Sequence, residues 1–225
     1  MKALITGGSR GLGRALALEL AGRGWRVIVT GRNADTLQAV AATNSHIAAI
    51  AGTIRSEDHR VELAAAVGES LDLLVNNASS LGPSPLLPIT DFDEDDLHTV
   101  FDTNVVSPLA LIGHLAPALA RAGGVVVNVS SDAAVEAYER WGPYGASKAA
   151  LDHASAILAI ERPELRTYAF DPGDMRTDMH QDAFPGEDIS DRPLPETVVP
   201  SILRLVESGL PSGRYAAAQI EALAA

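Results

Sequence analysis

The stretch "KALITGGSRGLGRALALELAGRG", residues 2–24, decides the fold. Its first five residues form a short apolar run of the kind found in strands buried on both faces. From residue 12 onward, leucines recur at helical spacing until the pattern ends in glycine at residue 24, which predicts a helix. The glycine-rich segment "TGGSRGLG", residues 6–13, joins the two. The sequence therefore predicts a strand, a tight turn and a helix in direct succession.

The same alternation continues along the chain. Further strands are predicted at 25–30, 46–52, within 71–79, and at 123–131, 166–170 and 213–217. Helices are predicted at 33–43, 56–68, 94–121, 143–160 and 195–208, with Pro108 and Pro117 bending or breaking the long one. Strands that alternate with helices predict an α/β fold, an open parallel β-sheet with helices on both faces. We expect residues 1–225 to form a single domain, since no linker divides them.

Composition narrows the class of function. Of 225 residues, 47% are hydrophobic, which suits one large core, and the net charge of −12 argues against nucleic acid and anionic membranes as partners. There are no cysteines, so disulfides and thiolate chemistry are excluded. The N-terminus lacks the pattern of a signal peptide, no apolar run reaches about 18 residues, and no histidines fall at metal-ligand spacing. We expect a cytoplasmic protein with no metal, no nucleic acid and no membrane partner.

The glycine-rich turn has the features of a dinucleotide site. Gly7, Gly11 and Gly13 allow a sharp turn and a close approach of the backbone to a ligand. The helix that follows offers free N–H groups and a partial positive charge to a diphosphate. Ser9, Arg10 and Leu12 complete the expected contacts of the turn. The alternative is an ordinary tight turn, but its place at the first strand–helix junction favours the dinucleotide.

The end of the second predicted strand bears on which dinucleotide binds. An acidic residue there would bind the adenosine ribose and repel a 2′-phosphate. This chain instead has Gly31 followed by Arg32, and Arg10 lies in the glycine turn. Two guanidinium groups would favour the phosphate, so we expect NADP(H) rather than NAD(H). The alternative is that both arginines are solvated surface charges.

A set of polar residues later in the chain fits proton transfer. Tyr144 and Lys148 lie four residues apart in a predicted helix and so share one face. An ammonium beside a phenol lowers the pKa of the phenol. Ser131 ends a predicted strand, where its hydroxyl can stabilise negative charge on a carbonyl oxygen. Asn104 lies in a predicted helix, where its amide accepts from a helix N–H or anchors a water leading to Lys148.

These motifs together resemble the short-chain dehydrogenases/reductases. The resemblance rests on "TGGSRGLG", "NNA" at 76–78, Asn104, Ser131, "YGASK" at 144–148 and "DPGDMRT" at 171–177, and spans about residues 1–180. It implies a Rossmann-type doubly wound sheet and a catalytic tetrad of Ser131, Tyr144, Lys148 and Asn104. It further implies cofactor contacts from Thr53, Ile54, Asn77, Ala78, Tyr144, Lys148, Pro172, Gly173, Met175 and Thr177, with Thr177 at the nicotinamide carboxamide.

Two positions depart from the family's pattern. Ser79 replaces a glycine after "NNA", and Thr53 stands where an acid usually meets the adenine. The resemblance implies an NADPH-dependent oxidoreductase that reduces a ketone or aldehyde to an alcohol, or the reverse. The alternatives are a non-catalytic NADP(H)-binding regulator or scaffold, and a Rossmann enzyme of another chemistry such as a methyltransferase.

The substrate is expected between the loops 79–90, 132–143 and 179–193. Tyr138, Trp141 and Phe184 either wall this pocket or merely pack the loops. The proline- and acid-rich loop 179–193 is expected to be a lid. The resemblance also implies a homodimer or homotetramer formed through the helices at 94–121 and 143–160.

Overall fold

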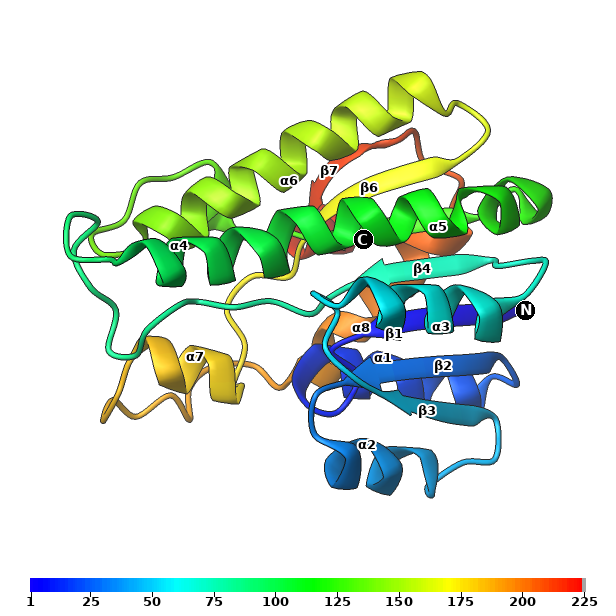
Figure 1. Ribbon diagram of the computed structural model, residues 1–225, viewed down its shortest axis with the longest axis horizontal. Helices are drawn as coiled ribbons and strands as arrows, with labels where there is room; N and C mark the ends of the chain where they lie inside the picture. The colour runs from blue at the N-terminus through cyan, green and yellow to red at the C-terminus, as the bar shows by residue number, and fades with distance from the viewer. Residues whose placement is uncertain (224–225) are drawn as a thin grey trace.

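The computed structural model describes residues 1–223, and in this part of the chain seven strands form one parallel sheet. The strand order is β3-β2-β1-β4-β5-β6-β7 (Figure 1). The strands are β1 (Lys2–Thr6), β2 (Arg26–Gly31), β3 (Ile47–Ala51), β4 (Leu73–Asn76), β5 (Val125–Val129), β6 (Arg166–Asp171) and β7 (Gly213–Ala216). The predicted parallel sheet is therefore confirmed.

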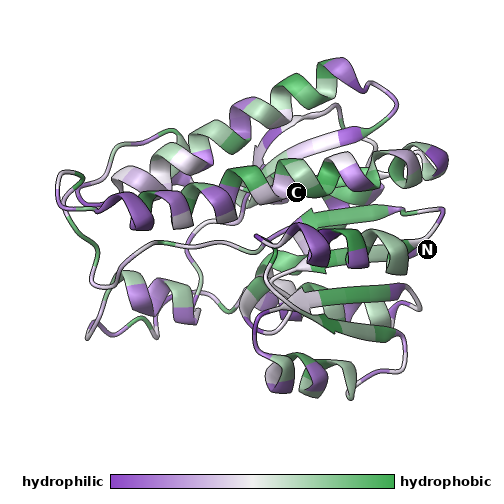
Figure 2. Cartoon of the chain, in the orientation of Figure 1, coloured by the Kyte–Doolittle hydropathy of each residue, from purple (hydrophilic) through white to green (hydrophobic). Residues whose placement is uncertain are grey.

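Helices cover both faces of the sheet. One face packs against α1 (Gly11–Gly22), α2 (Ala34–Ala41), α8 (Pro195–Glu207) and α9 (Ala217–Ala222), and the other against α3 (Glu57–Val67), α5 (Ser107–Ala122) and α6 (Gly142–Glu161). Because side chains alternate along a strand, Ile5 joins the first core cluster and its neighbour Leu4 joins the second. The hydrophobic strands run between the two helical layers (Figure 2).

The predicted long helix is a continuous helical stretch with a change of pitch. It consists of α4 (Glu94–Phe101), a π-helical turn (Asp102–Val106) and α5. Pro108 lies in the first turn of α5, where proline is tolerated, and Pro117 lies inside α5 without ending it. Length and composition alone would let Glu94–Ala122 span a bilayer. However, Leu111, Leu115 and Leu119 are buried against the sheet, as in a core helix of an α/β fold.

Two short helices were not predicted from the sequence. α7 (Asp178–Ala183) lies in the region expected to be a loop, and Thr177 caps it by accepting from the N–H of His180 at 3.1 Å. α9 follows β7 near the end of the described chain. Both have six residues, too few for a hydrophobic period to be recognised in the sequence.

The helices expected to mediate self-association carry exposed apolar side chains. Leu109 lies on α5, Val106 precedes it, and Ile157 and Ile160 lie on α6. Exposed apolar residues are normal when scattered, so the homo-oligomer stays a prediction.

The glycine-rich turn holds α1 close to the sheet. Gly7 has a φ of 68°, a conformation that favours glycine. A Cβ atom on Gly13 would lie under 3.0 Å from the carbonyl oxygen of Gly7. The N–H of Gly8 donates to the carbonyl of Thr30 at 3.0 Å, which ties the turn to β2. The turn is therefore fixed by contacts that leave no room for a side chain at Gly13.

Gly13→Ala is expected to destabilise the fold by about 1–3 kcal/mol, because the added methyl group forces backbone atoms apart. The matched control is Gly22→Ala in the same helix, where a Cβ atom meets nothing within 4 Å. Alanine there is expected to leave stability unchanged or raise it, by up to about 1 kcal/mol. Urea unfolding midpoints of the two variants measure the contrast, and equal midpoints would contradict the packing role of Gly13.

Candidate active site

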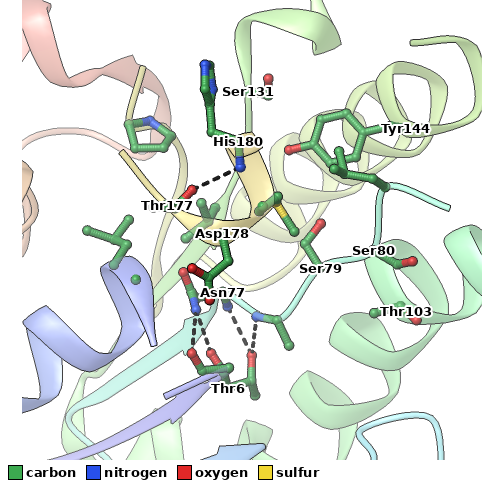
Figure 3. A pocket seen from close by; sticks show the side chains of 18 of the residues that line it. Thr6, Asn77, Ser79, Ser80, Thr103, Ser131, Tyr144, Thr177, Asp178 and His180 are labelled. Atoms are coloured by element: carbon green, nitrogen blue, oxygen red, sulfur yellow. Dashed lines mark hydrogen bonds between the residues drawn. The ribbon is translucent and has the colours of Figure 1, made fainter. Parts of the chain in front are cut away.

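A cavity of about 490 Å³ lies at the carboxyl ends of β1, β2, β4, β5 and β6, beside the N-terminus of α1 (Figure 3). Most of the residues expected from the sequence line it. They are Gly7, Ser9, Arg10, Gly11, Leu12, Arg32, Thr53, Ile54, Asn77, Ala78, Ser131, Tyr144, Lys148, Pro172, Gly173, Met175 and Thr177. The structure thus gathers residues from the whole length of the sequence around one space.

Two expected site residues do not line the cavity. Gly13 lies behind the turn, packed on the carbonyl of Gly7, so it shapes the turn and does not face a ligand. Asn104 is 1% exposed and lies in the π-helical turn between α4 and α5. Both act on the cavity through the residues that they hold in place.

The amide of Asn104 joins the loop after β4 to α6. Its oxygen accepts from the N–H of Ser80 at 2.8 Å and from the hydroxyl of Ser79 at 3.1 Å. Its nitrogen donates to the carbonyl of Ser80 and to the hydroxyl of Ser147, both at 2.9 Å. The expectation that this amide accepts from a helix N–H is wrong, because the serines occupy the oxygen.

The floor of the cavity is a rigid junction between β1 and β4. The side-chain amide of Asn77 donates to the carbonyls of Thr6 and Gly7 at 2.9 and 3.1 Å. The N–H groups of Asn77 and Ala78 both donate to the Thr6 hydroxyl at 3.0 Å (Figure 3). The nitrogen of the Asn77 side chain is therefore committed to the glycine turn, and only the remaining atoms of Asn77 face the cavity.

The N-terminus of α1 suits a diphosphate. No described side chain caps this helix, and its first turn carries no acidic residue. Free N–H groups at such a helix end attract anions. The cavity beside it is within the size range of cofactor sites, about 300–1,000 Å³. The residues present therefore fit a dinucleotide with its phosphates on the glycine turn.

The two arginines near the expected 2′-phosphate differ in their contacts. Arg10 donates to Asp178 of α7 at 2.8 Å, and both side chains are more than half exposed, at 60% and 65%. An exposed ion pair of this kind is worth little. Arg32 follows β2 and lines the cavity on the same side. Arg10 thus has a competing partner that the sequence did not reveal.

Tyr144 and Lys148 are both buried, on the first turns of α6. Burial raises the pKa of the Tyr144 hydroxyl above its ordinary value, and the nearby hydroxyl of Ser131 opposes this shift. The Lys148 ammonium lies 5.5 Å from the Tyr144 ring centroid and donates to the carbonyl of Val129 at 2.7 Å. The expectation that Lys148 gives the phenol a lowered pKa is wrong for the net shift, because loss of hydration dominates.

Burial also acts on the lysine. It lowers the pKa of Lys148 to about 8, against the opposing charge of Asp152. The Lys148 side chain is therefore mostly charged at neutral pH, but its pKa of about 8 is close enough that a small rise in pH removes much of the charge.

Several polar contacts around Ser131 and Tyr144 did not follow from the sequence analysis. Asp132 accepts from the hydroxyl of Ser131 at 2.8 Å. The hydroxyl of Tyr138 lies 3.0 Å from a carboxylate oxygen of Asp132 and 2.9 Å from one of Glu136, and its single proton serves either acceptor, so this ring presents a polar group at the cavity. Ser79, noted only as a departure from the family's pattern, places a hydroxyl close enough to lower the pKa of Tyr144. In the sequence, Tyr138 was named only as a candidate wall of the substrate pocket, and Asp132 and Ser79 stood out only as neighbours of Ser131 and "NNA".

The outer part of the cavity has an apolar wall. The Trp141 ring packs on Tyr144 with centroids 5.5 Å apart and on Phe184 at 5.9 Å. Leu81, Leu86, Ala133, Met179 and Ala183 complete this cluster. Of the three aromatic residues expected at the substrate loops, Trp141 and Phe184 are therefore apolar wall residues that line the cavity.

Comparison with known proteins agrees with this geometry. The sequence profile of the family described as short chain dehydrogenase matches residues 1–188. Serine 3-dehydrogenase of Agrobacterium fabrum (strain C58) is 36% identical over 184 residues, 78% of this chain and 72% of that enzyme. The NADPH-dependent pterin aldehyde reductase of Arabidopsis thaliana is 34% identical over 190 residues, 80% of this chain and 77% of that enzyme.

A solved structure extends the likeness to the whole fold. A short chain dehydrogenase from Shigella flexneri 2a, complexed with NADP, superposes with a TM-score of 0.90 at 28% identity, covering 96% of each chain. The fold is that of the short-chain dehydrogenases, a family of oxidoreductases that bind a nicotinamide cofactor. This chain belongs to the short-chain dehydrogenase/reductase family.

The charge of Lys148 can be measured directly, because Lys2 and Lys148 are the only two lysines in the sequence. With ¹³C-lysine labelling, one of two side-chain NMR signals is expected to titrate with a midpoint of about 8. Lys2→Arg leaves a single signal and so assigns it. A Lys148 midpoint near the ordinary value of about 10.4 would contradict the effect of burial.

Proposed function

We propose that this protein is an NADPH-dependent reductase of ketones or aldehydes, or catalyses the reverse oxidation of an alcohol. One observation carries the proposal: Ser131, Tyr144 and Lys148 meet at one side of a cavity whose other side is a dinucleotide-type glycine turn. A phenol, a hydroxyl and an ammonium are the groups that carbonyl reduction requires around the oxygen of the substrate. The membership of the oxidoreductase family supports it.

In this proposal a carbonyl compound, NADPH and one proton become an alcohol and NADP⁺. Bound NADPH supplies the hydride that reduces the carbonyl carbon. Tyr144 gives its hydroxyl proton to the carbonyl oxygen. Ser131, whose hydroxyl donates to Asp132 in this structure, turns its proton to the carbonyl oxygen as charge develops. Lys148 holds a positive charge beside the phenol while the proton leaves.

The electrostatics of the site support Tyr144 as an acid. Burial raises the pKa of the phenol, so it holds its proton at neutral pH. A protonated phenol is the form that reduction consumes. We therefore expect the reduction rate to fall as pH rises through about 8, where Lys148 loses its charge.

The preference for NADP(H) is part of the proposal. Arg32 lines the cavity beside Gly31 at the carboxyl end of β2, where no acidic side chain stands. A guanidinium there favours a 2′-phosphate through charge-assisted hydrogen bonds. The NADP complex of the Shigella protein and the NADPH-dependent plant relative support this assignment.

The substrate class is bounded by the walls of the cavity. The cluster of Trp141, Phe184 and the neighbouring aliphatic side chains favours a substrate with an apolar or aromatic part. The names of the relatives suggest the first compounds to test. A screen of aldehydes and ketones with NADPH, including a pterin aldehyde, together with L-serine and NADP⁺, reads turnover as absorbance at 340 nm (a property of the reduced cofactor). No turnover with any compound, despite NADPH binding, would favour a non-catalytic binding protein.

Tyr144→Phe is expected to lower kcat by about 100- to 10,000-fold, because the proton donor is lost. The dissociation constant for NADPH, measured by fluorescence, is expected to change little. Tyr138→Phe is the matched control, since this phenol also lines the cavity but is bound to Asp132 and Glu136. It should retain most of the activity. Full turnover by Tyr144→Phe would refute the proposed acid.

Arg32→Ala is expected to weaken NADPH binding by about 10-fold, because a charge-assisted contact to the 2′-phosphate is lost. The affinity for NADH should stay within about twofold, since NADH lacks that phosphate. Arg26→Ala is the control, because Arg26 is exposed at the opposite end of the same strand. If both variants weakened the two cofactors alike, the loss would reflect overall charge and the assignment of Arg32 would fail.

A further inference from the structure

A largely buried charge network joins Arg214, Asp152 and Asp171 next to the candidate catalytic residues. Arg214 extends from β7, the last strand of the sheet, towards the carboxyl ends of β5 and β6. Its side chain is 28% exposed, and its two carboxylate partners, Asp152 and Asp171, are 14% and 9% exposed. Charged groups in such surroundings are expensive unless they are paired.

The guanidinium of Arg214 bonds to three separate elements. Nη2 donates to the carbonyl of Ser131 at 2.9 Å and to the carboxylate of Asp171 at 3.0 Å. Nε donates to the carboxylate of Asp152 on α6 at 2.9 Å. One side chain therefore fixes the end of β5, the end of β6 and the helix that carries Tyr144 and Lys148.

The contact with Asp171 continues into the cavity wall. The other oxygen of Asp171 accepts from the N–H of Gly173 at 3.0 Å. Gly173 and Pro172 line the cavity on the side expected for the nicotinamide. Arg214 thus holds, through one intermediate residue, the turn that would position that end of the cofactor.

The contact with Asp152 continues to Lys148. Asp152 lies one helical turn after Lys148, and its negative charge favours the ammonium form of the lysine. Burial raises the pKa of Asp152, while the nearby Ser130 hydroxyl, the hydrogen bond from Arg214 and the charges of Arg214 and Lys148 oppose that rise. Asp152 is therefore shared between two cations.

We propose that Arg214 and Asp152 are positioning residues for the reaction: Arg214 fixes the Ser131 backbone and the Asp171–Gly173 turn, and Asp152 sustains the charge of Lys148. The role of the two residues in catalysis rests on the proposed function. Arg214 lies outside residues 1–188, the part that the family profile matches, so the role does not follow from family membership. In this proposal β7 supplies a positioning residue in addition to completing one edge of the sheet.

The first test reads the Lys148 signal in ¹³C-lysine-labelled protein, which needs neither substrate nor cofactor. The charged and titratable groups that face the Lys148–Tyr144 pair are Asp152 from α6, Asp171 from β6, Arg214 from β7 and Asp132 after β5. Asp152→Asn is expected to lower the titration midpoint of Lys148, because a negative neighbour is lost. Arg214→Met is expected to raise it, because Asp152 then has Lys148 as its remaining cation.

Arg166→Met is the matched control. Arg166 starts β6 and donates to the carbonyl of Val206 at 2.9 Å, far from the cavity end of the sheet. It should leave the Lys148 midpoint unchanged. Arg214→Lys keeps the charge, adds a third lysine signal, and is expected to hold the Lys148 midpoint near that of the wild type. Asp152→Asn covers the case that Arg214→Met does not fold.

The second test separates positioning from simple loss of stability. Arg214→Met is expected to lower kcat by about 10- to 100-fold and to weaken NADPH binding, because small displacements of reacting groups are costly. Arg166→Met, assayed at the same interval below its own melting temperature, should leave both kcat and the affinity for NADPH unchanged. An unmoved Lys148 midpoint in Asp152→Asn, together with an unmoved midpoint in Arg214→Met where that variant folds, would overturn the proposal. Equal kinetic losses in Arg166→Met would overturn it as well. Failure of the wild type to turn over any carbonyl would instead refute the proposed function. The NMR measurement would still decide whether Asp152 and Arg214 set the charge of Lys148, because it needs no substrate.

Discussion

The parallel direction of all the strands in the described chain is the constraint on which the site depends. In such a sheet every strand ends at the same edge, and ligands bind beyond those ends. Thr6, Asn76, Val129 and Asp171 end four of the strands, and the residues directly after them form the cavity. Motifs more than a hundred residues apart in the sequence converge for this reason alone. The glycine turn adds the one local requirement, a helix that packs closely enough to present its N-terminus.

Burial of the reactive groups is the second influence on the chemistry. Loss of water raises the pKa of Tyr144 and lowers that of Lys148, so it drives both groups towards their neutral forms. A buried phenol that keeps its proton suits an acid, but an uncharged lysine would not assist it. The hydroxyl of Ser131 and the carboxylate of Asp152 oppose these shifts. The neighbours of the tyrosine and the lysine therefore matter as much as the pair itself.

The sequence predicted what depends on local pattern and failed where long-range contacts decide. Strands, the long helices and the glycine turn follow from runs of neighbouring residues, and the family resemblance located the lining residues of the cavity. The upward shift of the Tyr144 pKa depends on how deeply the phenol is buried, which no local pattern states. The partners of Asn104 and the role of Arg214 depend on residues 24 to 83 positions away. The helix α7 was missed because six residues show no hydrophobic period, and Thr177, its N-cap, was interpreted only as a cofactor contact.

The two sides of the cavity are held by contacts of different strength. On the side of α6, the Asn104 amide is buried and makes four hydrogen bonds, which is the full capacity of its two donors and two lone pairs. Opening that side would leave a buried amide unpaired, at a cost of about 1–3 kcal/mol for each polar group. On the other side, the polar contacts of α7 are the exposed Arg10–Asp178 pair and the Ser84 hydroxyl on the carbonyl of Asp182, and its apolar contacts are those of Met179 and Ala183 in the small cluster around Trp141. Exposed contacts exchange with water at little cost. Any opening of the cavity is therefore expected to begin at α7, while Tyr144 and Lys148 stay in place.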